Sequence, residues 1–343
     1  MLRHRQLGIL LSKMIYFAPL RSVLFYLCFV LQFCCLASVG ANAPQPVEAF
    51  PLSDVRLREG LHQQIQQRSA RWILAIDPQR VLHLFRTNAQ LPTTAESLGG
   101  WESEGHVLRG AFAGHYLSIC SQLYAVTGDA RFKQRVETVV AGLAECQRAL
   151  GESGYLCAYP ESAFDYAEAG EPNRQGISSV PYYTVHKIMR GLYDAHKLCH
   201  NRLARQMLFA MARWTDQRST RLQEEHMQEF LNIEHGGMVE ILLDLYADTG
   251  EKVFLRAAKR FEHRRIIDPL AQRDDSILLH LHGNSTVPKI LGAARAYELL
   301  GDEQYRQIAE FFWDSVIQTR SYVTGNSTNK EHWGYPNKLA GEL

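Results

Sequence analysis

Apolar positions recur along the chain at the three- and four-residue spacing of amphipathic helices, and one such pattern repeats. The copies read "LYAVTGDARF" from Leu123, "LYADTGEKVF" from Leu245 and "AYELLGDEQY" from Ala296, with a looser copy, "LYDAHKLCHNRL", from Leu192. In the three closer copies an apolar helix ends at a glycine, which accepts left-handed backbone, and an acidic residue opens the next helix. The pattern predicts helical hairpins that turn at Gly128, near His200, at Gly250 and at Gly301.

The two helices of each predicted hairpin differ in character. The second is amphipathic, since Phe254, Ala257, Ala258 and Phe261 share one face. The first is more apolar and rich in small residues, as in "VPKILGAARAYELL" from Val287. We therefore expect the first helices to form an inner layer and the second an outer layer. Repeated hairpins stack as a solenoid or close into an α/α toroid, and no comparable run of alternating strands is present, so the predicted fold class is all-α.

Polar and aromatic residues precede each predicted inner helix. The segments are "GGWESEGHVLRGAFAGHYLS" from Gly99, "VPYYTVHKIMRG" from Val180, "NIEHGGMVEILL" from Asn232 and "LHLHGNSTVPKILG" from Leu279, with similar residues in "SYVTGNSTNKEHWGYPNKL" from Ser321. Inner helices of a ring share polarity, so these segments should meet on one face. Each histidine taken alone could be a cap or a core residue, but the repetition favours a pocket suited to a sugar. We expect one shared cavity to receive His115, His186, His235, His282 and Glu331.

Composition narrows the choice of function. The net charge is +1 and no basic stripe is evident, which argues against a nucleic-acid partner. Four of the seven cysteines lie beyond the first 43 residues, widely separated and without a C-x-x-C pair. They are therefore interpreted as buried or free thiols and not as a disulfide framework or a metal site.

The N-terminus resembles a targeting segment. Basic residues precede the apolar run "VLFYLCFVLQFCCLASV" from Val23, and small residues follow in "GANA". This layout predicts a signal peptide over residues 1–43, a secreted or periplasmic protein, and no stable membrane insertion after cleavage. An uncleaved membrane anchor is the alternative. The remaining domain would span residues 44–343.

Several motifs together resemble those of the β-L-arabinofuranosidase glycoside hydrolases. They are "GGWES…GHYLS", "LAECQ", "YTVHK", "EHGGM", "HGNSTVPKILGAARAYELLGD" and "YVTG…EHWG", in order over roughly residues 50–343. The resemblance implies an (α/α)6 barrel followed by β-sandwich domains. It also implies removal of terminal L-arabinofuranose from plant-type glycans, with retention of configuration.

The resemblance also implies roles for individual residues. Glu331 in "KEHWG" matches the general acid/base, and His115, His186 and His282 match residues that grip the sugar. Trp333 and Tyr335 would provide the partly dry surroundings that keep an acid protonated. The substrate-binding set predicted from the resemblance and the pocket together is His115, His186, His235, His282, Trp101, Tyr183, Asn284 and Trp333.

The family's nucleophile is a cysteine thiolate held on zinc by a glutamate and further cysteines, in an "E-T-C" motif and a later segment. Neither is found in this sequence. We therefore expect a barrel that is incomplete at its C-terminus and a chain that is an inactive fragment. We expect no metal ligand and no cofactor in this chain, and zinc only in a full-length family member. Other departures concern the substrate: Lys330 stands where glycine is usual, and Val239 replaces a common asparagine. The competing hypotheses are a non-catalytic carbohydrate-binding toroid protein and a different toroid enzyme, such as a lyase or epimerase.

Overall fold

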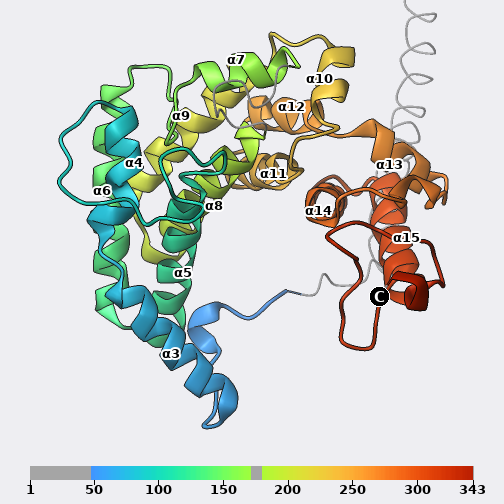
Figure 1. The fold of residues 1–343 in the computed structure, drawn as a ribbon, viewed down its shortest axis with the longest axis horizontal. Coiled ribbons are helices and arrows are strands. Elements are labelled where there is room, and N and C mark those ends of the chain that lie inside the picture. The colour runs from blue at the N-terminus through green and yellow to red at the C-terminus, as the bar shows by residue number, and fades with distance from the viewer. Residues whose placement is uncertain (1–47, 171–179, 343) are drawn as a thin grey trace, which may run out of the picture. The chain divides into compact units, whose positions relative to one another are not determined.

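The computed structural model describes residues 48–170 and 180–342, so the predicted signal segment, residues 1–43, lies outside the described residues. Packing contacts group Leu52–Leu343 into one unit, which contains every named helix. Its described residues form α-helices and short 3-10 turns, with β pairing limited to three isolated bridges (Figure 1). The predicted all-α fold class is confirmed.

The described residues contain the four predicted hairpins. They are α5 (Ala111–Thr127) with α6 (Ala130–Ala149), α8 (Pro181–Cys199) with α9 (Arg202–Ser219), α11 (Met238–Thr249) with α12 (Lys252–Arg260), and α14 (Gly283–Leu300) with α15 (Glu303–Thr319). The turns lie at the predicted residues, all with left-handed backbone: φ is 71° at Gly128, 57° at His200, 70° at Gly250 and 67° at Gly301.

The outer helices begin where the acidic residues follow the turns. Asp129 accepts a hydrogen bond from the Arg131 N–H, and Asp302 accepts one from Gln304 N–H. Asn201 plays the same part for α9 in the looser copy, accepting from Ala204 N–H. Each side chain satisfies a backbone donor that the first helical turn leaves without a partner.

Shorter elements surround the hairpins. Before them come η1 (Leu52–Asp54), α3 (Leu61–Ala75) and α4 (Pro78–Asn88), of which α4 packs on α6. Between them lie α7 (Ser162–Glu168), α10 (Glu224–Phe230), α13 (Arg264–Ala271) and η3 (Ser276–Leu278); α13 packs on α15. The last described element is η4 (Leu339–Glu342).

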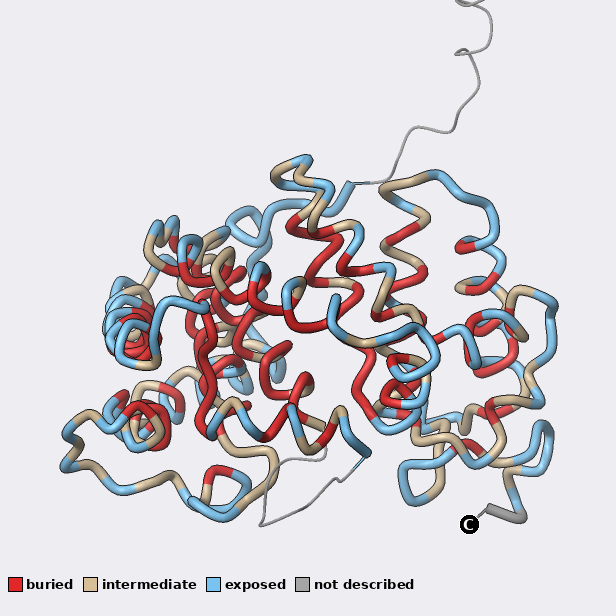
Figure 2. Tube along the Cα trace, turned by 90° about the horizontal axis from the view of Figure 1, so that it is seen from above, coloured by how far each residue is buried: buried red, intermediate tan, exposed pale blue. Residues whose placement is uncertain are grey.

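The first helices form the inner layer, as predicted. Helices α5, α8, α11 and α14 contact one another in that order, while α6, α9, α12 and α15 lie on their outer side (Figure 1). Small residues allow this close packing: a Cβ on Gly292 of α14 would lie 2.7 Å from the Cβ of Val239 of α11. Buried residues follow the facing sides of the helices, and the loops are largely exposed (Figure 2).

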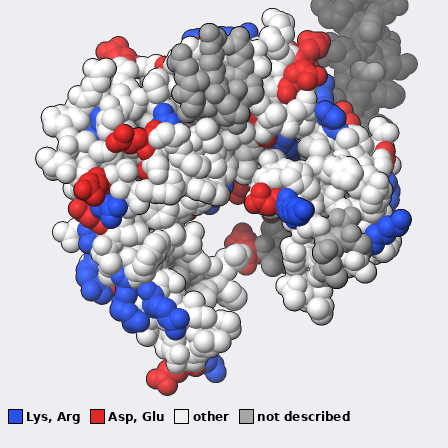
Figure 3. All heavy atoms as spheres, in the orientation of Figure 1, with Lys and Arg blue, Asp and Glu red and all other residues white. Residues whose placement is uncertain are grey.

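The surface of the unit carries charges of both signs. Figure 3 shows acidic and basic side chains interspersed over one face, with one group of Lys and Arg over α3 and α6. Over residues 48–170 and 180–342, no helix combines the length and the apolar character needed to cross a bilayer.

Candidate functional site

The N-terminal ends of three inner helices meet at a cavity of about 610 Å³. Tyr183 comes from the first turn of α8, His235 from the loop before α11, and Asn284 from the first turn of α14. Six of the predicted site residues line this cavity: Trp101, Tyr183, His235, His282, Asn284 and Glu331. Its volume lies in the range of small-molecule sites.

Glu331 meets two of these residues across 47 and 49 positions of sequence. Its Oε2 lies 3.2 Å from Nε2 of His282, and its Oε1 accepts a 3.4 Å hydrogen bond from the amide of Asn284. The other imidazole nitrogen of His282 lies 3.0 Å from the Ser285 hydroxyl. The Glu331 side chain is 68% exposed, so its carboxylate is held at the mouth of the cavity and not in a dry interior.

The loop that carries Glu331 is fixed by its backbone. The Gly283 N–H donates to the Glu331 carbonyl, the His280 N–H to the Trp333 carbonyl, and the Trp333 N–H to Leu281, at 2.7, 2.9 and 3.0 Å. Lys330 and Glu331 both have positive φ, 45° and 68°. Lys330 is exposed, and its side chain stands on left-handed backbone that glycine adopts more readily.

Trp333 does not line the cavity, contrary to the expected sugar contact. It is 2% exposed, and its ring packs edge-on against Phe312 of α15, with centroids 5.8 Å apart. Tyr335 is half-exposed and neighbours the ring of His280. Neither ring lines the cavity that Glu331 borders, and the Glu331 side chain is largely exposed, so the dry surroundings expected from these two residues are not found there.

Two histidine rings lie side by side next to the cavity, tilted against each other. His235 lines it, while His186 lies behind His235, with ring centroids 5.4 Å apart and planes inclined by 30°. Burial lowers the pKa of His235 to about 3 and holds the pKa of His186 well below its usual value. Neutral imidazoles can both donate to and accept from hydroxyl groups. Neither nitrogen of His186 has a partner among the described residues.

A buried carboxylate explains why a glutamate precedes "HGG". Glu234 is fully buried and accepts hydrogen bonds from the Tyr183 and His235 N–H groups at 2.8 and 3.1 Å. It therefore caps the start of α8, and burial raises its pKa to about 8. Glu102 does the same for α5, accepting from Gly110 and Phe112 N–H at 2.6 and 2.8 Å. The repeated acidic residues thus support the inner helices from which the site is built.

The sequence prediction missed a buried lysine in the cavity wall. Lys289 of α14 is 4% exposed, and its ammonium donates to the Leu231 carbonyl and to Nδ1 of His263 at 2.7 and 2.8 Å. Burial lowers its pKa to about 8. A lysine on the apolar inner helix was the available signal, since burying an ammonium is costly unless it is fully hydrogen-bonded.

His115 faces a second cavity. This cavity, of about 470 Å³, is lined from α3, α4 and α5 and shares Trp101, Leu108 and Tyr183 with the first. The predicted single cavity is therefore corrected: His235, His282 and Glu331 line the first, His115 lines the second, and His186 lies behind the wall. Sequence could not set these positions, because they depend on how the inner helices and the loops before them pack together.

The described cysteines lie away from both cavities. Cys120 is in α5, Cys146 in α6 and Cys199 in α8, and Cys157 lies in the loop before α7; all four are buried. Burial raises the thiol pKa to about 12 for Cys120 and Cys157, and to about 11 for Cys146. Within the described ranges, no three His, Cys, Asp or Glu side chains gather in a metal-binding group.

Comparison with known proteins places this geometry in a family. The chain resembles the solved structure of a GH127 beta-arabinofuranosidase, BT3674, with a TM-score of 0.58 and 15% identity over 83% of this chain and 46% of that one. It also resembles Ara127N-Se, a GH127 beta-L-arabinofuranosidase from Geobacillus stearothermophilus T6, with a TM-score of 0.53 and 17% identity over 74% of this chain and 42% of that one.

The chain thus spans less than half the length of either structure, and the likeness between them is one of fold. No curated protein matches the sequence. The family model described as the beta-L-arabinofuranosidase GH127 catalytic domain matches residues 54–343. Helical hairpins around a cavity, the motifs that line it and this match together show that the chain belongs to the GH127 β-L-arabinofuranosidase family.

Proposed function

We propose that the protein recognises a terminal L-arabinofuranose, or a similar sugar, of plant-type glycans in the first cavity, and that Glu331 is the general acid/base of a retaining glycoside hydrolase. The observation that carries this proposal is the carboxylate of Glu331, held at the cavity mouth by His282 and Asn284 in a chain of this family. A retaining hydrolase needs one carboxylic acid beside the glycosidic oxygen. The two polar contacts position that acid without enclosing it.

The remaining lining residues suit a neutral, hydroxyl-rich ligand. Trp101 and Tyr183 offer aromatic faces, and the neutral His235, whose Nδ1 accepts from the Gly237 N–H, offers its Nε2–H as a donor. Glu331 would protonate the leaving-group oxygen in the first step and deprotonate water in the second. In this assignment the described residues bind and orient the sugar, and Glu331 transfers the proton.

The zinc-held thiolate that the family resemblance implies does not fit the described residues. The four described thiols are buried in helix packing or loop core, and their raised pKa values oppose the thiolate that a metal or a nucleophile requires. No covalent step is assigned to them. We propose that this chain binds sugar without turnover, because none of the described thiols is suited to act as the nucleophile. We also propose that the protein is secreted, on the N-terminal sequence pattern alone.

A binding and turnover experiment on the full chain tests the proposal. Calorimetric titration with methyl β-L-arabinofuranoside should give one site per chain, weakened about tenfold or more by Glu331→Ala or His282→Ala. Glu303→Ala, an exposed glutamate on α15 outside the cavity, is the matched control and should bind as wild type does. Absence of sugar binding by the folded wild type would overturn the proposal.

A chromogenic β-L-arabinofuranoside distinguishes the catalytic proposal from its alternative. Any hydrolysis by the wild type should fall about 10²–10⁴-fold in Glu331→Gln, the usual loss for a positioned acid–base group. Turnover that Glu331→Gln leaves unchanged would refute its role. Binding with no turnover is the result expected for this chain, whereas turnover that depends on Glu331 would refute the alternative function, a non-catalytic carbohydrate-binding protein built on the same toroid.

A further inference from the structure

We propose that Lys289 is a positioning residue for the first cavity: its ammonium holds the loop that carries His235 against α14, the helix from which Asn284 faces the same cavity. The inference rests on the proposed function for the sugar that fills the cavity. It goes beyond that function because Lys289 acts through the residues that face the sugar. Neither the sequence motifs nor the family match assigns this role to it.

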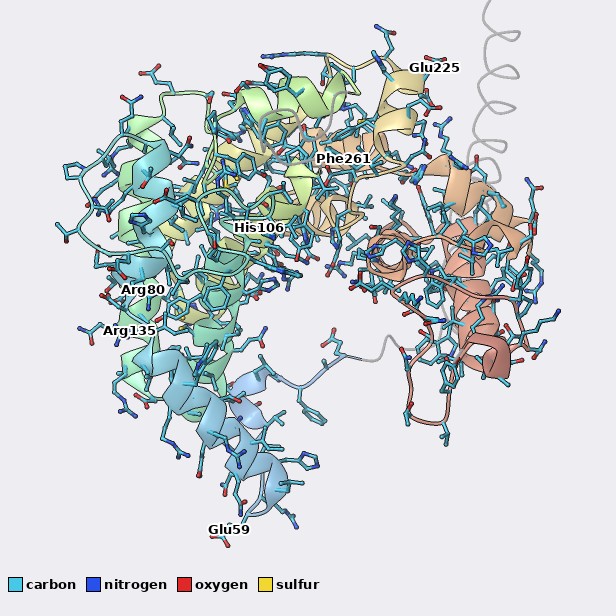
Figure 4. The ribbon with its side chains drawn as sticks, in the orientation of Figure 1. Glu59, Arg80, His106, Arg135, Glu225 and Phe261 are labelled. Atoms are coloured by element: carbon cyan, nitrogen blue, oxygen red, sulfur yellow. The ribbon has the colours of Figure 1, made fainter. Side chains whose placement is uncertain are left out.

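The first argument is that the ammonium joins two loops to one inner helix. It donates to the carbonyl of Leu231, before α11, at 2.7 Å, and to Nδ1 of His263, before α13, at 2.8 Å. An ammonium has donors only, so Nδ1 accepts and the neutral His263 carries its proton on Nε2. Phe261, labelled in Figure 4, marks where α12 ends and the chain turns toward His263. The two acceptors lie 58 and 26 positions from Lys289, so the ammonium is a tertiary link.

The second argument is that this link is sheltered from water. Lys289, Leu231 and His263 are all buried. A hydrogen bond from a charged donor is stronger in such surroundings than in water. An ammonium that lost either acceptor would be left partly unpaired in the interior, which is costly. The ammonium therefore keeps both loops at fixed positions on α14.

The third argument is a backbone contact beside the cavity histidine. Gly236 follows His235 directly, and a Cβ on Gly236 would lie 2.1 Å from Cγ and 2.6 Å from the backbone nitrogen of Lys289. The stem of Lys289 thus touches one end of the loop while its ammonium holds the other end at Leu231. The residues between these two contacts that line the cavity are Asn232, Ile233 and His235.

The fourth argument is that another wall of the cavity is fixed to the same helix. Asn284 lies in the first turn of α14, and the Gly283 N–H donates to the Glu331 carbonyl at 2.7 Å. Lys289 lies roughly one and a half turns further along α14. The loop of His235 and the loop of Glu331 are therefore both held on α14. Lys289 is the side chain that holds the first of them, so it sets where His235 meets a sugar that also contacts Glu331.

Removing the donors while keeping the stem tests the role. Methionine has nearly the length and volume of lysine but no N–H donor. Lys289→Met should weaken the binding of methyl β-L-arabinofuranoside, measured by calorimetry on the full chain, by about tenfold, the size of one misplaced hydrogen bond. Circular dichroism verifies that the variant keeps its helices. Wild-type affinity in the folded Lys289→Met protein would overturn the proposal.

The matched control is Ile290→Ala, on the next residue of the same helix. Ile290 is buried and lines neither cavity, so its truncation lowers stability by opening a void but leaves both loops anchored. Its affinity for the sugar should stay at the wild-type value. An equal weakening in Ile290→Ala and Lys289→Met would overturn the proposal, because any loss of stability would then weaken binding.

Chemical rescue shows whether the ammonium itself is required. Lys289→Ala removes the stem and the charge, and n-propylammonium replaces both through the cavity that Lys289 lines. Added n-propylammonium should restore most of the affinity lost in Lys289→Ala, whereas tetramethylammonium, a cation without N–H donors, should restore none. Equal rescue by the two cations, or no rescue by n-propylammonium, would count against the two hydrogen bonds as the cause.

A measurement without sugar separates this proposal from the proposed function. In the chain labelled with ¹⁵N-histidine, Lys289→Met should shift the ring signals of His263 and His235, and leave those of His115 on α5 in place. If these shifts occur but the wild type binds no sugar, the proposed function alone is refuted. If the wild type binds sugar, and Lys289→Met binds it equally and shifts neither ring, the positioning role alone is refuted.

Discussion

The contact between α5 and α8 makes Gly114 the position at which the smallest substitution should do most harm. A Cβ at Gly114 would lie 1.9 Å from the Lys187 carbonyl oxygen and 2.7 Å from the Ile188 nitrogen, which are backbone atoms of α8. On the other side, Gly191 approaches the Gly114 carbonyl almost as closely, since a Cβ there would lie 2.5 Å from it. The two helices touch through their backbones, and no side chain can move aside to admit a methyl group.

The cost of Gly114→Ala follows from this geometry. Ordinary contact begins near 3.4 Å, so the helices would have to separate by about 1.5 Å. Overpacking costs about 1–3 kcal/mol where side chains can yield, and more where they cannot. Replacing a glycine in a helix by alanine stabilises the helix by about 1 kcal/mol, which offsets part of this cost. We expect a net loss of about 3 kcal/mol, which for a domain of this size lowers Tm by roughly 6–12 °C.

A matched glycine separates steric cost from helix propensity. Gly142, in the interior of α6, would place its Cβ 2.3 Å from Cδ1 of Leu82, the end of a flexible side chain. Gly142→Ala should therefore stay within about 1 kcal/mol of wild type. Thermal and urea unfolding followed by circular dichroism measure both variants. A Gly114→Ala protein as stable as wild type, or one no less stable than Gly142→Ala, would refute the backbone contact of α5 and α8.

Two further predictions concern strain and pH. Lys330→Gly should raise the free energy of unfolding by about 0.5–1 kcal/mol. A φ of 45° costs a residue with a side chain about 1–2 kcal/mol, and the greater freedom of glycine in the unfolded chain cancels part of that gain. Lys338→Gly, outside the left-handed region, is the control, and urea unfolding should show no stabilisation of that variant. His263 is 3% exposed, and burial lowers its pKa to about 3. As pH falls below about 6.5, the unfolded chain binds a proton at this histidine and the folded chain does not, so the folded state loses stability. Wild type should lose about 2 kcal/mol more between pH 6.5 and pH 5 than His263→Gln does, and parallel losses in the two proteins would contradict the assignment.

The sequence alone determined the helical hairpins and their turns. A glycine at a helix end acts through its backbone conformation, and Asp129 and Asp302 act through a hydrogen bond two residues away. Gly128, Gly250 and Gly301 could therefore be located without tertiary information. The apolar stripe of α12 was equally local, and Phe254, Ala257 and Ala258 are all buried. The meeting of polar segments at the inner-helix ends followed from the shared direction of those helices.

Only the tertiary structure decided how those segments meet. The contact between Glu331 and His282 joins residues 49 positions apart, and it depends on backbone pairing of one loop with the start of α14. The same pairing turns Trp333 into the core, although its sequence position beside Glu331 suggested a sugar contact. His115 of α5 and His235 of the loop before α11 line different cavities, and His186 of α8 lies behind the ring of His235. Sequence spacing fixes which residues share an element, whereas the direction of a side chain depends on packing between elements, which no local pattern encodes.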